Sequence, residues 1–76
     1  MTEPLSEELF TRRGFSKDSD EEYSATIRNM KMQFYKGEFR DDLGTYIELR
    51  VEGQLRKTGY YHNDADFLTD EMFRNL

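Results

Sequence analysis

The segment from Ser19 to Gly37 constrains the fold of this chain more than any other stretch. Ser19 and Glu22 have the spacing of a capping box, in which each side chain bonds a free amide of the first helical turn. Gly37 stands where a left-handed residue ends a helix, directly after Lys36, which favours the negative end of the helix dipole. Between these ends, four apolar residues recur at helical spacing: Tyr23, Ile27, Met30 and Phe34. The pattern predicts one amphipathic helix over this segment.

The second half of the same segment also has the period of a β-strand. Apolar and polar residues alternate there, and the apolar set is Met30, Met32 and Phe34. Met32 and Tyr35 lie off the apolar stripe of the helical interpretation. We favour the helix because capping residues stand at both of its ends and its spacing extends over a longer range.

Residues 1–17 are predicted to form an N-terminal arm ahead of a single domain over residues 18–76. Ser6 is placed to begin a short helix and Gly14 to end it. A helix this short is unstable alone in water, so it forms only where its apolar side chains pack on a surface. These side chains are Leu9, Phe10 and Phe15, and we take them as candidate partner-binding residues.

Residues 45–51 and 55–61 are rich in β-branched and aromatic side chains, and they flank Glu52 and Gly53. This arrangement predicts a β-hairpin. Its register is open at this point, because the loop between the two strands contains either two or three residues.

The two registers make different cross-strand pairs. A two-residue loop places Glu48 opposite Lys57, which is a favourable charge pair. A three-residue loop with a left-handed glycine places Val51 opposite Leu55. We favour the second register because it gathers the apolar side chains on one face, namely Ile47, Leu49, Val51, Leu55 and Tyr61.

The last segment predicts a helix from Ala65 to about Asn75, capped by Asp64. Its shared apolar face contains Phe67, Leu68, Met72 and Leu76. The predicted fold class is therefore α+β, in the order short helical arm, helix, strand, strand, helix. In this fold a two-stranded antiparallel hairpin packs on helices, because two strands alone are only marginally stable.

Composition limits both the core and the classes of function. Only 36% of the 76 residues are hydrophobic, so the core must be thin and must depend on six Phe and five Tyr side chains. The net charge is −5, with Lys and Arg scattered along the chain, which disfavours direct binding to nucleic acid. No apolar run approaches a membrane span and there is no cysteine, so we expect a cytoplasmic protein with no membrane partner.

The candidates for chemistry are weak. The densest set of metal-ligand types is His62, Asn63, Asp64, Asp66, Asp70 and Glu71. Its spacing does not fit a calcium-binding loop, and Asp64 already serves as a helix cap. No serine or threonine stands recognisably beside a base, and the glycines are too dispersed to form a phosphate-binding loop. We therefore expect no metal, no cofactor and no enzymatic activity.

The hairpin tyrosines are stronger candidates for a binding surface. Adjacent strand residues face opposite sides of a sheet, so at least one of Tyr60 and Tyr61 lies off the core face. Exposed aromatic residues beside arginine are typical of protein-binding hot spots, and Arg50 and Arg56 lie on the same hairpin. Tyr60, Tyr61 and Arg56 therefore join the arm residues as candidate partner-binding residues.

These features predict a small acidic, non-enzymatic protein–protein interaction module that docks on and modulates a larger protein, as an adaptor or inhibitor. One alternative is a homo-oligomeric assembly protein, in which hairpins pair edge to edge or arms swap between copies. Another is an acidic mimic of DNA that inhibits a nucleic-acid-binding protein. The carboxylates available for such mimicry are Glu7, Glu8, Asp18, Asp20, Glu21, Glu22, Asp41 and Asp42.

Overall fold

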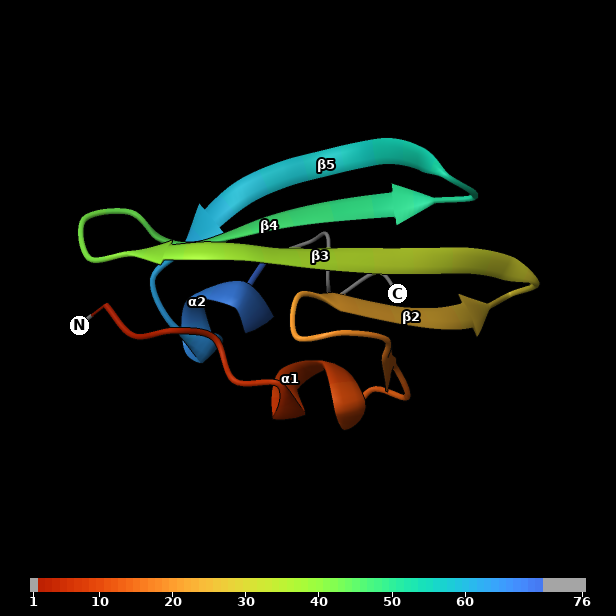
Figure 1. Ribbon diagram of the computed structural model, residues 1–76, viewed down its shortest axis with the longest axis horizontal. Coiled ribbons are helices and arrows are strands. Elements are labelled where there is room, and N and C mark those ends of the chain that lie inside the picture. The colour runs from red at the N-terminus through yellow and green to blue at the C-terminus, as the bar shows by residue number, and fades with distance from the viewer. Residues whose placement is uncertain (1, 71–76) are drawn as a thin grey trace.

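A five-stranded antiparallel sheet is the main element of the computed structural model, which describes residues 2–70. Each strand pairs with the next along the chain, and two short helices lie on one side of the sheet (Figure 1). The strands are β1 (Ser16–Lys17), β2 (Glu22–Ile27), β3 (Met30–Arg40), β4 (Gly44–Val51) and β5 (Gln54–Tyr61). The helices are α1 (Glu8–Thr11) and α2 (Asp64–Leu68).

The α+β prediction is wrong, and the error lies in residues 19–37. This segment forms a turn followed by β2 and most of β3, instead of one helix carrying a hairpin. Arg28 and Asn29 both have a positive φ, of 54° and 66°, as the two-residue turns of tight hairpins require. The predicted helical stripe becomes two cross-strand pairs, Tyr23 with Phe34 and Ile27 with Met30.

The predicted hairpin is present as β4 and β5, but its turn differs from the favoured register. Val51 pairs with Gln54, so the loop contains the two residues Glu52 and Gly53, both with positive φ. A β-bulge beside Arg50 then shifts the pairing, and Leu49 lies opposite Lys57. Beyond the bulge the register is the favoured one, and Ile47, Leu49 and Tyr61 face the core. Leu55 pairs with Arg50 instead and is 49% exposed.

A core of aromatic side chains fills the space between the sheet and the helices, and Phe10 is at its centre. The Phe10 ring stacks on Tyr23 with centroids 4.6 Å apart and also contacts Phe34 and Phe67, at 5.3 Å and 5.6 Å. The other buried apolar side chains are Leu5, Leu9, Phe15, Met32, Ile47, Leu49 and Tyr61. The predicted arm thus contributes Leu5, Leu9, Phe10 and Phe15 to the same core as the sheet.

The segment before α1 is held against the end of the sheet. The Glu3 amide donates to the carbonyl oxygen of His62 at 2.7 Å, and the Leu5 amide donates to Thr45 Oγ1 at 3.2 Å. The amide and hydroxyl of Ser6 donate to the two carboxylate oxygens of Asp64, at 3.0 Å and 2.7 Å. These bonds connect the N-terminal segment with β4, with the residue that follows β5 and with α2.

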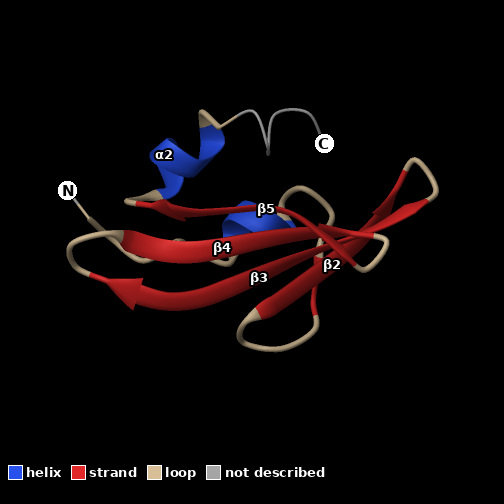
Figure 2. Cartoon of the chain, turned by 90° about the horizontal axis from the view of Figure 1, so that it is seen from above, coloured by secondary structure: helices blue, strands red, loops and turns tan. Residues whose placement is uncertain are grey.

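Helix α2 begins one residue earlier than its predicted cap implies. Asn63 is the N-cap, and its side chain accepts a hydrogen bond from the Asp66 amide at 2.8 Å. Asp64, the predicted cap, instead binds Ser6. The helix ends at Leu68, while the remaining predicted helical residues, 71–75, and the face residues Met72 and Leu76 lie outside the described residues. Figures 1 and 2 place α2 toward the end of the sheet that carries the β3–β4 turn, away from the β2–β3 and β4–β5 turns.

Phe10→Ala should lower the free energy of unfolding by about 3–5 kcal/mol, because it removes the ring that packs against three other aromatic rings. Chemical denaturation followed by circular dichroism measures this change. Leu43→Ala is the matched control, since Leu43 is 37% exposed and its loss should cost less than about 1 kcal/mol. Equal midpoints for the two variants would show that Phe10 does not centre the core.

Two buried tyrosines provide a second test. The Tyr61 hydroxyl donates to Asp70 at 2.9 Å, whereas the Tyr23 hydroxyl has no hydrogen-bond partner among residues 2–70. Tyr61→Phe should therefore cost about 1 kcal/mol at neutral pH, and Tyr23→Phe should be neutral or stabilising. Destabilisation of both variants by the same amount would contradict this contrast.

The Tyr61 variant also carries a pH signature. Burial, followed by the bond to Asp70, raises the pKa of Tyr61 above its ordinary value of 10.0. Above pH 10 the unfolded chain therefore loses the Tyr61 proton, whereas the folded protein keeps it. The contribution of the Tyr61 hydroxyl group to the free energy of unfolding is complete below pH 10 and is lost as the pH rises. The stability advantage of the wild type over Tyr61→Phe should shrink above pH 10 in denaturation curves. An advantage that stays constant through this range would contradict the assignment.

Candidate functional site

The side of the sheet opposite the helices carries a row of tyrosines. Tyr35, Tyr46 and Tyr60 come from β3, β4 and β5, and neighbouring rings have centroids 6.4 Å and 5.2 Å apart. All three rings lie partly in solvent, and Tyr60 is 43% exposed. We call this surface the open tyrosine face, and its further members on the same side of the strands are Glu22, Gln33, Glu48, Arg50 and Thr58.

Gly37 permits the close approach of two of these rings. A Cβ atom at this position would lie 3.0 Å from Cδ2 of Tyr46 and 3.1 Å from Cε2 of Tyr35. The strand pairing between β3 and β4 also shifts between Lys36 and Phe39, so Tyr46 lies beside the irregular stretch that contains Gly37. Gly37, which the sequence pattern predicts to end a helix, instead leaves room for the aromatic rings of Tyr35 and Tyr46.

Hydrogen bonds orient two of the tyrosines on this face, Tyr46 and Tyr35. The Tyr46 hydroxyl donates to Glu48 Oε2 at 2.8 Å, and Arg50 Nη2 lies 3.2 Å from the other oxygen of the same carboxylate. The bond to Glu48 is the largest cause that raises the pKa of Tyr46. The pKa of Tyr35 is raised as well, first by a hydrogen bond to Glu21. Both carboxylates therefore favour the protonated form of the hydroxyl group that they accept from.

A shallow depression of about 410 Å³ lies on this face beside Tyr35. Glu22 on β2, Tyr35 on β3 and Glu48 on β4 are direct cross-strand neighbours, so they form one row across the sheet. The complete lining is Glu22, Gln33, Phe34, Tyr35, Glu48 and Arg50. An aromatic ring therefore stands between two carboxylates at this point of the surface.

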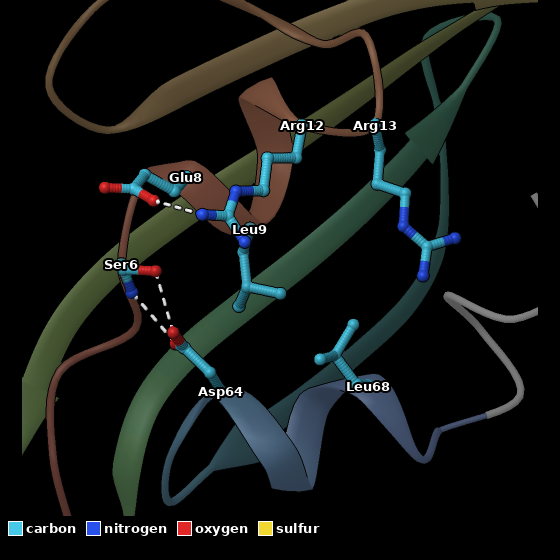
Figure 3. Close-up of a pocket in the computed structure, with 7 residues that line it drawn as sticks. All are labelled: Ser6, Glu8, Leu9, Arg12, Arg13, Asp64 and Leu68. Carbon is cyan, nitrogen blue, oxygen red and sulfur yellow. Dashed lines mark hydrogen bonds and ion pairs between the residues drawn. The ribbon is translucent and has the colours of Figure 1, made fainter.

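A second hollow of about 290 Å³ lies on the opposite side, between α1 and α2 (Figure 3). Leu9 and Leu68 provide apolar surface, and Arg12 and Arg13 stand on one wall. Its polar groups are engaged within the chain, since Asp64 binds Ser6 and Arg12 Nη2 lies 3.1 Å from Glu8 Oε2. The remaining lining residue with a charge, Arg13, also has an interaction within the chain. This hollow is therefore a weaker candidate than the open tyrosine face.

The structure separates the sequence-predicted binding residues into two groups. Tyr60 and Arg56 are exposed on β5, and Tyr60 belongs to the open tyrosine face. The other four are buried in the core, namely Leu9, Phe10, Phe15 and Tyr61. They hold the helices on the sheet in the free chain, and their hydrophobic surface is already covered.

Tyr35 is a surface residue that the helical interpretation of residues 19–37 does not identify, because that interpretation only places it off the apolar stripe. The alternation of residues 30–35 was the signal that could have found it, because Tyr35 and Gln33 share the face opposite Met32 and Phe34. Tyr46 lies within residues 45–51, the first strand of the predicted hairpin, but its contact with Tyr35 depends on the pairing of β3 with β4.

The acidic residues near the C-terminal end of the described chain have separate partners. Asp64 binds Ser6, Asp66 accepts from the His62 amide at 2.9 Å, and Asp70 binds Lys57 and Tyr61. Among residues 2–70, no three histidine, aspartate or glutamate side chains are grouped so as to hold a metal ion. Within the same part of the chain, neither helix has the length and apolar character to cross a membrane.

Comparison with protein-family models, with curated proteins and with solved structures found no match to this chain.

Glu48→Ala should lower the pKa of Tyr46 toward its ordinary value, because it removes the acceptor that stabilises the protonated hydroxyl. Titration of the ¹³Cζ resonances of labelled tyrosines by NMR measures this change. Tyr35 is the internal control, since its main acceptor is Glu21 and its pKa should move less. A larger shift at Tyr35 than at Tyr46 would contradict the hydrogen-bond pattern.

Proposed function

We propose that this protein is a non-enzymatic interaction module that docks on a larger protein through the open tyrosine face. The observation that carries the proposal is the row formed by Tyr35, Tyr46 and Tyr60 on the uncovered side of the sheet. Tyrosine and arginine are the residue types enriched in protein-binding hot spots, and this face also contains Arg50. We also propose that the protein is cytoplasmic, and the absence of cysteine from the sequence is compatible with this location.

The side chains of the tyrosine row are preorganised in the free chain. Contacts between neighbouring rings and the chain of bonds from Tyr46 through Glu48 to Arg50 restrict side-chain rotation. Immobilising a flexible side chain on binding costs about 0.5–1.5 kcal/mol, and this cost is smaller where the contact residues are already ordered. This order supports the face as a docking surface.

The two edges of the sheet are poorly suited to pairing with another copy of the chain. Strand β1 at one edge has two residues, and β5 at the other edge carries a β-bulge beside Arg56 and Lys57. Bulges and cationic side chains are devices by which sheet edges avoid pairing with another copy. These features favour the adaptor hypothesis over edge-to-edge assembly.

The acidic residues give weaker support to mimicry of DNA. Several of them lie in ion pairs within the chain, because Lys17 contacts Glu7 and Asp20, and Arg40 contacts Asp42. These pairs reduce the continuous negative surface that a copy of the phosphate backbone would need. We therefore propose docking by aromatic side chains ahead of mimicry.

The double variant Tyr46→Ser, Tyr60→Ser should weaken partner binding at least about 30-fold, the loss expected when hot-spot residues are removed. The partner is first captured by affinity purification with mass spectrometry, and its affinity for purified wild type and variants is then measured by calorimetry. Leu43→Ser is the matched control, because Leu43 is exposed but lies in the β3–β4 turn, outside the open tyrosine face.

Equal affinities for the double variant and the control would overturn the proposal. A stable oligomer seen by light scattering, together with the absence of any captured partner, would favour the self-assembly alternative. Circular dichroism of all three proteins is required beforehand, so that loss of binding is not loss of folding.

A further inference from the structure

The depression on the open tyrosine face combines an aromatic ring with opposed carboxylates. The cross-strand row places Tyr35 between Glu22 and Glu48, and Gln33 lines the same depression. An aromatic ring attracts a cation placed above its face, because the face of the ring carries partial negative charge. Flanking carboxylates add charge-assisted hydrogen bonds to such a cation.

The charges around Tyr35 are predominantly negative. Glu21, Glu22 and Glu48 all lie close enough to raise the pKa of its hydroxyl. Arg50 is the cation of the depression lining, and it is already paired with Glu48 at 3.2 Å. Within residues 2–70, the Glu22 carboxylate has no ion-pair partner. The depression therefore offers at least one carboxylate to an incoming positive charge.

We infer that this depression binds an arginine side chain on a basic surface of the partner protein, an inference that rests on the proposed function. The planar guanidinium stacks on the Tyr35 ring and directs its N–H groups to Glu22 and to the side-chain oxygen of Gln33. Lysine presents a compact, strongly hydrated charge and lacks both the plane and the fork of donors. Arginine therefore matches the ring and carboxylates better.

The charge of the whole chain agrees with a basic protein partner. The net charge of −5 attracts a positive surface at long range and accelerates encounter at low salt. A single-stranded nucleic acid would also stack on tyrosines, but its phosphates would lie beside Glu21, Glu22 and Glu48. The carboxylates thus select a cationic protein over a polyanion.

The test uses the purified 76-residue chain and two small probes, N-acetyl-arginine amide and the neutral isostere N-acetyl-citrulline amide. Each is titrated into ¹⁵N-labelled protein and followed by NMR. The arginine probe should give saturable shifts at the amides of Glu22, Gln33, Tyr35 and Glu48 in the millimolar range. The citrulline probe should give none that saturate.

Glu22→Gln keeps the shape of the side chain but removes its charge, and it should weaken binding of the arginine probe at least threefold. Glu3→Gln is the matched control, since Glu3 is an exposed glutamate in the segment before α1 and should leave the affinity unchanged. Absence of saturable shifts, equal affinity for citrulline, or equal affinities of the two variants would each overturn the inference.

The inference and the proposed function fail separately. If the arginine probe does not bind but Tyr46→Ser, Tyr60→Ser still loses its protein partner, the arginine pocket is overturned and docking by the face survives. If the probe binds to wild type and the tyrosine variant keeps full affinity for the protein partner, the proposed function is overturned and the pocket survives.

Discussion

The stacking of Phe10 on Tyr23 is the interaction on which the rest of the structure depends. It joins a one-turn helix near the N-terminus to the second strand of the sheet, and Phe34 and Phe67 pack on the same ring. A helix as short as α1 does not persist alone in water, and an antiparallel sheet needs a second layer to bury its apolar side. The Phe10 ring anchors α1 on the sheet and covers part of the apolar side of the sheet, so the helix and the sheet form together.

One-sided packing also determines which surface is available for function. Only 36% of the residues are hydrophobic. The core on the helix side contains the buried aromatic side chains, namely Phe10, Phe15, Tyr23, Phe34, Tyr61 and Phe67. The opposite side receives tyrosines, whose rings pack together while their hydroxyl groups reach carboxylates and water. The open tyrosine face is therefore a consequence of the composition as well as a candidate for binding.

The sequence identifies the β4–β5 hairpin and the position of α2, but it misassigns residues 19–37 for a definite physical reason. Tyr23, Ile27, Met30 and Phe34 share one face of a helix, and the same spacing pairs the outer two and the inner two across a two-residue turn. Spacing alone cannot separate these structures. The choice depends on β4, which pairs with β3 and extends the sheet, and on Phe10, which covers it.

The candidate site shows the same limit of local reasoning. Alternation along β5 separates Tyr60 from Tyr61, so one exposed tyrosine was predictable from neighbouring residues alone. The row with Tyr35 and Tyr46 depends on the shifted pairing of β3 with β4 and on the space that Gly37 leaves for both rings. Because that space exists only after the strands pair, the binding surface is a property of the assembled sheet. A glycine that resembles a helix stop in the sequence therefore acquires its role from tyrosines on two different strands.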